Sequence, residues 1–153
     1  NDTGKGGNGR DTILGEAGRD TLLGQAGRDT LLGGTQNDTL RGGGLGDTLK
    51  GQGGADKLHG DAGNDKLIGG IGRDQFFFRA NGGTDTVRDF RDDIDTLKID
   101  DNLWSGTKSV AKVINDFAVV TNGVAVFTFD GGEKLKVNGV SDLDILLDDI
   151  SII

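Results

Sequence analysis

The stretch Gly6-Gly7-Asn8-Gly9-Arg10-Asp11-Thr12-Ile13-Leu14 recurs, with variations, along the first half of the chain. Its Asp recurs at every ninth residue without exception: Asp2, Asp11, Asp20, Asp29, Asp38, Asp47, Asp56, Asp65 and Asp74. Two residues after each Asp from the second onward stands one large apolar side chain: Ile13, Leu22, Leu31, Leu40, Leu49, Leu58, Leu67 and Phe76. Five residues before each of the same Asp residues stands a glycine: Gly6, Gly15, Gly24, Gly33, Gly42, Gly51, Gly60 and Gly69. A period of nine therefore organises residues 1–78.

This period excludes a helix and favours a coil of short strands. A helix of about 3.6 residues per turn would scatter the apolar positions around its surface, and each interior glycine would cost it about 1 kcal/mol. A three-residue strand with its middle side chain pointing inward, followed by a six-residue glycine-rich turn, satisfies every regularity. Two such units complete one turn of a flattened parallel coil, and a single layer of Leu from each side fills its interior.

The coil brings the repeated Asp residues into two rows. Residues 18 apart become neighbours at about 4.8 Å on adjacent strands. We name the two rows the Asp11 ladder (Asp11, Asp29, Asp47, Asp65) and the Asp2 ladder (Asp2, Asp20, Asp38, Asp56, Asp74). They lie on opposite edges of the coil.

Carboxylates stacked in this way repel one another unless a cation lies between them. A hard cation with about six to eight oxygen ligands could take one carboxylate from each of two successive rungs and the rest from turn carbonyls. The sequence therefore predicts columns of Ca²⁺, with about seven ions for the seven Asp pairs 18 apart. The eight glycines that begin the repeats, Gly6 to Gly69, are the candidate carbonyl donors, and Asp85 is a further candidate side-chain ligand.

Composition agrees with oxygen ligation and excludes several other classes. Asp supplies 23 of the 25 acidic residues, which is typical of turns and of sites for hard cations. The chain has no Cys, so it has neither a disulfide scaffold nor a cysteine-ligated metal. A net charge of −8 argues against a nucleic-acid partner, and no apolar run is long enough to predict a membrane span.

The nonapeptide resembles Gly-Gly-x-Gly-x-Asp-x-U-x, the repeat of the RTX (repeats-in-toxin, hemolysin-type) calcium-binding proteins, in which U is a large apolar residue. Residues 6–14, residues 60–68 and six further copies carry the resemblance. It implies a mainly β chain with a right-handed parallel β-roll, calcium in the turns, and export from a Gram-negative bacterium through a type I channel.

Several copies depart from this pattern. The fourth position is Gln36 in one copy and Leu45 in the next, and we expect these two sites to be the weakest or most distorted. Gly4 replaces the inward apolar residue after Asp2, so we expect a frayed first rung. The second-position glycine is replaced in four copies, by Glu16, Gln25, Gln52 and Asp61, and this matters only if the position needs a positive φ.

Residues 79–153 are predicted to form a mainly β cap after the roll of residues 1–78, because an open coil end exposes core and an unpaired strand edge. Alternating segments at 84–90 and 95–99 resemble the region that follows the roll in serralysin-type RTX proteins. We expect one or two short helices, the first at 109–117 and a last helical turn near Ser141 and Asp144. Asn122-Gly123 predicts a hairpin, and a third strand should cover 133–137.

The C-terminal tail has two interpretations. Asp149 followed by Ile-Ser-Ile-Ile at 150–153 is similar to the uncleaved secretion signals of the RTX family. An edge strand that completes a sheet would have the same pattern.

No catalytic constellation is expected, so the chain is predicted not to be an enzyme. Gly4, Gly6 and Gly9 satisfy a dinucleotide-binding spacing, but neither a helix nor an acidic ribose partner follows. His59, the only His, occupies an outward and exposed position with no nucleophile placed near it. The acidic cluster Asp92, Asp93, Asp95, Asp100 and Asp101 is interpreted as calcium ligands or turn formers rather than a catalytic pair.

These observations favour a secreted, extracellular calcium-binding module of a larger protein. It would stay unfolded at cytosolic calcium and fold outside the cell, where it would support type I export and stabilise the upstream domain. A chain that starts at Asn1 and contains no Met is expected to be a fragment. The alternative is a module that binds polysaccharide or a surface, since outward apolar residues such as Leu14, Leu32 and Phe77 could seat a glycan, the cap or another domain.

Overall fold

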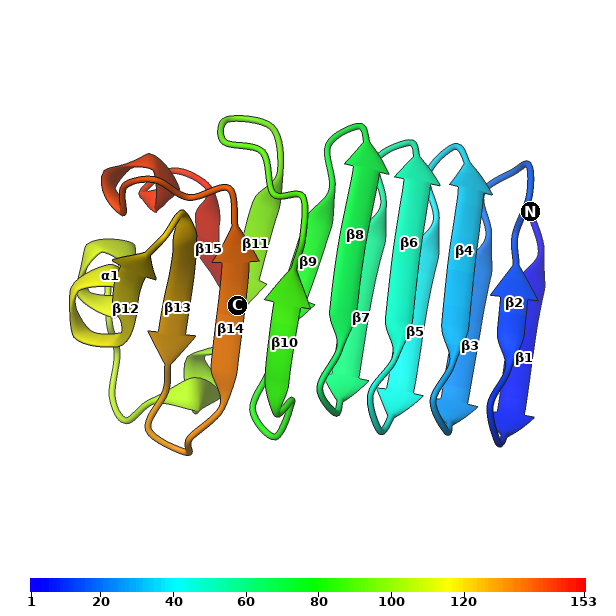
Figure 1. The fold of residues 1–153 in the computed structure, drawn as a ribbon, viewed down its shortest axis with the longest axis horizontal. Helices are drawn as coiled ribbons and strands as arrows, with labels where there is room; N and C mark the ends of the chain where they lie inside the picture. The colour runs from blue at the N-terminus through cyan, green and yellow to red at the C-terminus, as the bar shows by residue number, and fades with distance from the viewer.

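Ten strands wind the first half of the chain into a flattened coil of five turns, two strands to a turn, in the computed structural model, which describes residues 1–153 (Figure 1). The strands are β1 Thr3–Asn8, β2 Thr12–Leu14, β3 Thr21–Ala26, β4 Thr30–Thr35, β5 Thr39–Gly44, β6 Thr48–Gly53, β7 Lys57–Ala62, β8 Lys66–Ile71, β9 Gln75–Phe78 and β10 Thr84–Val87.

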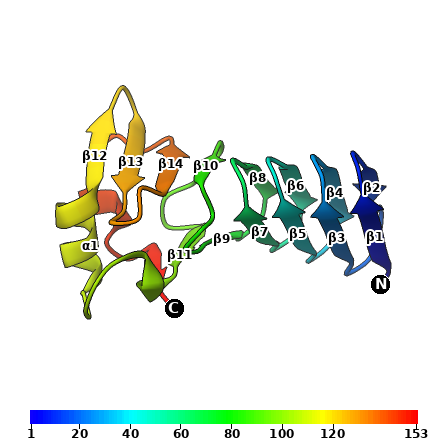
Figure 2. The same ribbon diagram turned by 90° about the horizontal axis from the view of Figure 1, so that it is seen from below.

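Odd and even strands form two separate parallel layers, which Figure 2 shows edge on. In one layer Leu22 of β3 pairs with Leu40 of β5, and in the other Leu31 of β4 pairs with Leu49 of β6. The two members of each pair are separated by two repeats of the sequence. The parallel coil and its register are therefore confirmed.

Most strands have six residues rather than the expected three. In β4 the inward side chain of Leu31 is followed by Gly33, which also faces inward and is buried. Pairing resumes beyond the repeat's first glycine, for example between Gln25 and Gly43 and between Ala26 and Gly44. The prediction was wrong here because a glycine can continue a strand when its missing side chain faces the interior. The turns shrink accordingly.

The core of the coil is one layer of leucines, each no more than 1% exposed: Leu22, Leu31, Leu40, Leu49, Leu58 and Leu67. The first rung is paired along β1 and β3, so the expected fraying at Gly4 is not found. A Cβ on Gly4 would lie 2.6 Å from Cγ2 of Ile13 and 3.2 Å from Cδ2 of Leu22. The inward apolar residue is absent from Gly4 because Ile13 from the opposite layer fills its space.

Residues 79–153 extend both layers and make the end of one layer a mixed sheet. Their further elements are β11 Thr96–Ile99, a 3₁₀ turn Asp101–Leu103, α1 Val110–Phe117, β12 Ala118–Thr121, β13 Val124–Thr128, β14 Lys134–Asn138, a 3₁₀ turn Asp144–Leu146 and β15 Ile150–Ile152. Strand β11 pairs with β9, and β15 ends that layer. Strand β10 pairs with β8 and with β14, from which β13 and β12 continue antiparallel.

The structure confirms most elements expected in this region. Ser109 caps α1, and Asn122 and Gly123, with φ of 52° and 74°, form the hairpin turn between β12 and β13. The predicted strand at 84–90 ends at Val87 instead. The C-terminal residues form β15, a parallel edge strand beside β11. No helix of the structure is long and apolar enough to cross a membrane.

Aromatic rings close the coil at the end formed by residues 79–153. This end lies opposite the N-terminus in Figures 1 and 2. Phe129 lies at the centre, with ring centroids 5.4 Å from those of both Phe78 and Phe117. Trp104 stacks on Phe117 at 5.9 Å. The core is therefore one leucine layer thick in the repeats and wider only where the aromatic residues gather.

We predict that Leu49→Ala destabilises the folded chain by about 2–5 kcal/mol, because Leu49 is fully buried and its neighbours are fixed by the sheet register. Urea unfolding in calcium-containing buffer measures the effect. Lys50→Ala, an outward neighbour on the same strand, is the control and should change stability by no more than about 0.5 kcal/mol. Equal effects would contradict the single-layer core.

Candidate metal centre

Hydrogen bonds between carboxylates and the backbone link the rungs of both ladders. From Asp2 to Asp56, the backbone N–H of each ladder Asp donates to Oδ1 of the Asp 18 residues later, at 2.7 Å from Asp20 to Asp38 and 2.7 Å from Asp29 to Asp47. From Asp20 to Asp74 the ladder residues are at most 3% exposed. Each carboxylate is therefore held in one orientation by the rung before it, through a charge-assisted bond.

The second oxygen of these carboxylates has no partner. Eight Oδ2 atoms are buried without a hydrogen bond: those of Asp11, Asp20, Asp29, Asp38, Asp47, Asp56, Asp65 and Asp74. A buried polar atom without a partner costs about 1–3 kcal/mol, and more when it carries charge. One of them, Asp74 Oδ2, lies 3.5 Å from Nη2 of Arg91. The other seven form no ion pair, and their two rows point to a missing positive group.

The first glycine of each repeat makes room for this oxygen. A Cβ on Gly6 would lie 2.8 Å from Asp11 Oδ2 and 2.8 Å from the carbonyl oxygen of Gly24 in the next turn. A Cβ on Gly33 would lie 2.6 Å from Asp38 Oδ2 and 2.8 Å from the Gly51 carbonyl oxygen. Glycine is required at this position for space, and the space is bordered by a carboxylate oxygen and a turn carbonyl.

The second and fourth positions of the repeat have positive φ throughout. Gln36 and Leu45, at φ of 77° and 70°, adopt the conformation that glycine has elsewhere. Their ladders run through these copies without distortion, since the bonds that reach Asp38 and Asp47 are among the shortest. The expected distortion is therefore absent, and weaker calcium binding there stays a prediction. The four second-position substitutions, Glu16, Gln25, Gln52 and Asp61, adopt φ of 65° to 78°.

Both ladders are one rung longer than the period of nine indicates. The N–H of Asp65 donates to Asp85 Oδ1 at 3.0 Å, and that of Asp74 donates to Asp95 Oδ1 at 3.0 Å. Asp85 therefore joins the Asp11 ladder, and Asp95 joins the Asp2 ladder. They follow Asp65 and Asp74 by 20 and 21 residues instead of 18, so the period of nine did not identify them. Each nevertheless begins an Asp-Thr-apolar triplet like those of the repeats.

The rest of the predicted acidic cluster does not converge on one site. Asp100 caps a 3₁₀ turn by accepting from the Asn102 N–H at 2.9 Å. The Asp93 N–H donates to Asp149 Oδ2 at 3.1 Å. These residues act as turn formers. Asp89, which no sequence pattern singled out, accepts the N–H groups of Gly69 and Gly70 and ties the cap to the last turn.

Burial raises the proton affinity of the ladders. Desolvation, opposed by the backbone hydrogen bond and reinforced by neighbouring carboxylates, raises the pKa of Asp47, Asp56 and Asp74 to about 6. Desolvation, with the charge of Asp65 next, raises the pKa of Asp85 to about 8. Without a metal the ladders are therefore costly to ionise near neutral pH.

The donor set fits a hard cation. No three acidic or His side chains converge on one point, so a cation between two rungs would complete its ligands with backbone carbonyls. All these donors are oxygen, which suits calcium and excludes the nitrogen and sulfur ligands that zinc prefers. The residues present thus fit the calcium columns expected from the sequence.

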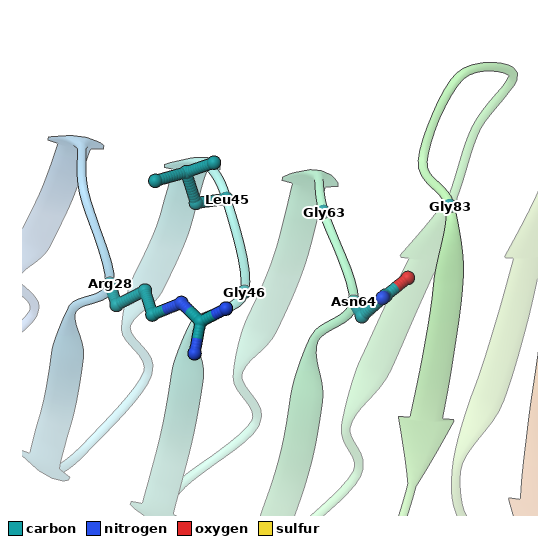
Figure 3. Close-up of a pocket in the computed structure, with 6 residues that line it drawn as sticks. All are labelled: Arg28, Leu45, Gly46, Gly63, Asn64 and Gly83. Atoms are coloured by element: carbon teal, nitrogen blue, oxygen red, sulfur yellow. The ribbon is translucent and has the colours of Figure 1, made fainter.

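The largest cavity, of about 420 Å³, is a separate feature on the edge of the Asp11 ladder (Figure 3). Gly46 occupies a position that carries Arg10 and Arg28 in the preceding turns. Arg28, exposed Leu45 and Asn64 line the resulting notch, together with backbone of Gly46, Gly63 and Gly83. No carboxylate lines it.

His59 is half-buried, and the expectation that it is exposed was wrong. Its ring stacks on Phe77 of the next rung, with centroids 4.0 Å apart and planes inclined by 14°. Burial, with the nearby charge of Arg41, lowers the pKa of His59 to about 4, so its ring is neutral at pH 7. The register of β7 and β9 produces this stack, because Phe77 holds the same position two repeats later and faces the same side.

Comparison with known proteins agrees with this geometry. A family model described as the RTX calcium-binding nonapeptide repeat, four copies, matches residues 5–40 and again residues 41–76. The chain is similar in fold to the crystal structure of the extracellular lipase LipA from Serratia marcescens, with a TM-score of 0.52 and 18% sequence identity. The alignment covers 99% of this chain and 38% of the lipase chain.

The chain thus spans well under half the length of that lipase, and the likeness concerns the fold. No curated protein matches the sequence. The family match, the unbroken period of nine and the pairing of strands two repeats apart agree with one another. Residues 5–76 of this chain are therefore RTX calcium-binding nonapeptide repeats.

Proposed function

We propose that this chain is a non-catalytic calcium-binding module whose coil is completed when its two Asp ladders take up calcium. The observation that carries the proposal is the set of eight buried Oδ2 atoms without a partner. Each faces the first glycine of its own repeat, and where a later turn follows, a carbonyl oxygen of that turn borders the same space, as at Gly6 and Gly33. Calcium bound there would supply the positive charge that seven of these oxygens lack; the eighth, Asp74 Oδ2, also lies 3.5 Å from Nη2 of Arg91.

The two oxygens of each ladder carboxylate have different roles in the proposed binding. Oδ1 is engaged by the backbone of the preceding rung, so it fixes the position of the carboxylate. Oδ2 remains available as a ligand, and the carbonyl donors are expected to be the first glycines of the repeats. We infer about seven ions, one for each pair of repeat Asp residues that stand two repeats apart.

The module would act outside the cell as part of a larger secreted protein. Calcium is scarce in the cytosol and abundant outside, so a coil that depends on it would fold only after export, through a type I channel. Similarity to an extracellular lipase of which the chain spans 38% supports a role in a longer secreted chain. The absence of Cys agrees with an oxidising exterior. The division into a roll of residues 1–78 and a cap of residues 79–153 belongs to the same proposal.

We predict that the chain is largely disordered after calcium removal and gains β-structure in millimolar calcium, because the leucine layer alone is too thin to offset repulsion within the ladders. Magnesium should fail at the same concentration, since it requires octahedral geometry and releases its waters reluctantly. Far-UV circular dichroism with each ion measures this. Unchanged strand content after chelation would contradict the proposal.

We predict opposite pH responses with and without calcium. The pKa of Asp47, Asp56 and Asp74 is about 6 in the fold against an ordinary 3.8, so their protons stabilise the metal-free fold. That contribution is complete below about pH 3.8 and is lost as pH rises through about 6, or through about 8 for Asp85. Lowering the pH from 8 to 5 should therefore increase order in the metal-free chain.

The same change should raise the calcium concentration needed for folding, because protons compete for the ligands. Circular dichroism at both pH values tests each arm, and a metal-free chain that is less ordered at pH 5 than at pH 8 would refute the argument.

We predict that a chain ending at Phe78 binds calcium far more weakly than the full chain. Removal of residues 79–153 takes away one of the two pairing partners of β8 and of β9, both ladder ends and most of the aromatic cluster. Repeat arrays propagate from a stable end, and this is the end with the larger core. Calorimetric titration compares the two chains, and a chain lacking residues 1–23 is the control, which should still fold with calcium. Equal affinity and cooperativity in the chain that ends at Phe78 would show that the cap does not nucleate folding.

A further inference from the structure

The two ladders end differently inside the cap. At the end of the Asp2 ladder, the Arg91 guanidinium lies between the last two carboxylates. Its Nη2 is 3.0 Å from Asp95 Oδ1 and 3.5 Å from Asp74 Oδ2, and its Nε donates to Asp95 Oδ2 at 3.3 Å. The side chains of Asp74 and Asp95 are at most 1% exposed, so the ion pairs are shielded from water on the carboxylate side.

Arg91 contacts the same kinds of oxygen that the other rungs leave for a metal. Asp74 Oδ2 is equivalent to the unpartnered oxygens of the earlier rungs. Nη2 of Arg91 also donates to the carbonyl of Gly72, which occupies the fourth position of its repeat. Fourth-position carbonyls face the following turn elsewhere in the coil, as that of Gly54 faces Gly72. The guanidinium thus combines two rung carboxylates with a turn carbonyl.

A local turn holds the guanidinium in this place. The backbone N–H of Asp95 donates to the Arg91 carbonyl at 2.9 Å, and the Arg91 N–H donates to Asp95 Oδ2 at 3.0 Å. Arg91 and Asp95 are close in sequence, so this arrangement needs no long-range contact to form. The positive group and its carboxylate partner arrive together when the chain folds.

The Asp11 ladder offers an internal comparison. Its last carboxylates, Asp65 and Asp85, have no Lys or Arg within ion-pair distance in the structure. They are as buried as Asp74 and Asp95. One ladder therefore ends on a carboxylate pair that lacks a cation, and the other ends on a pair that already has one.

We propose that Arg91 is a tethered cation that replaces calcium at the Asp74–Asp95 rung. This rests on the proposed calcium binding by the ladders. The Asp2 ladder then binds calcium up to Asp74, and the Arg91 guanidinium neutralises its last rung in place of a metal ion. Its C-terminal rung is complete without metal and provides a fixed start for the next rung. The Asp65–Asp85 rung has no such cation and would take an ion in addition to the seven inferred for the repeat pairs.

Counting bound calcium tests the assignment. The full chain and its Arg91→Ala variant are dialysed to equilibrium in saturating calcium, and bound ions are measured by elemental analysis. Arg91→Ala should bind one ion more per chain than the parent, because it frees Asp74 Oδ2, Asp95 and the Gly72 carbonyl.

Two variants serve as controls. Arg91→Lys keeps a positive charge and should bind the parental number of ions. Arg88→Ala removes a nearby exposed arginine that forms no ion pair and is the matched control. An unchanged count in folded Arg91→Ala overturns the proposal.

A second pair of variants decides the matter if Arg91→Ala does not fold. Asp95→Asn keeps the oxygen that accepts the Asp74 N–H but removes the charge at the proposed metal-free rung, so the ion count should not change. Asp38→Asn makes the same substitution within the calcium-binding part of the ladder and should lose at least one ion. Loss of an ion in Asp95→Asn would overturn the role of Arg91. A parent chain that binds no calcium would instead refute the proposed function itself.

Discussion

The fold depends on one repeated hydrogen bond, from the backbone N–H of a ladder Asp to Oδ1 of the Asp 18 residues later. This bond joins successive turns of the coil at both edges, and it places the remaining oxygen of each carboxylate in the interior of the turn. The same side chain thus sets the spacing between rungs and creates the charge that the fold must neutralise. Stability and the proposed ion binding therefore depend on the same side chains.

The repeats show how much a strict period can predict. The period of nine, one inward apolar residue per repeat and a constant Asp were enough to predict two layers, a register of 18 and two rows of carboxylates. Each of these follows from chain geometry alone, because a parallel coil admits no other neighbours for residues such as Leu31 and Leu49. Strand length was wrong because the inward Gly33 continues a strand at a point where glycine usually ends one.

The cap shows where prediction from sequence stops. Asp85 and Asp95 lie on the ladders at spacings of 20 and 21, and only the three-dimensional path of the 79–83 and 88–95 loops brings them into line. Arg91 could not be assigned for the same reason, since its partners Asp74 and Gly72 are distant in sequence. His59 was expected to be exposed because the stacking of Phe77 upon it depends on the register of a neighbouring rung. Local signals such as the Ser109 cap and the Asn122-Gly123 turn were reliable because they involve only adjacent residues.

The register of 18 also makes the coil behave as a screw. One full turn advances the axis by about 4.8 Å, so a single nonapeptide adds half of that distance and half a rotation. Insertion of one repeat would keep the pairing of each strand with the strand two repeats away, although the strands beside the insertion would exchange partners. A domain joined to the N-terminal end would then face the opposite side of the cap. Insertion of two repeats would restore its facing and move it one step farther away. The number of repeats therefore sets orientation as well as distance, and the two cannot be changed independently.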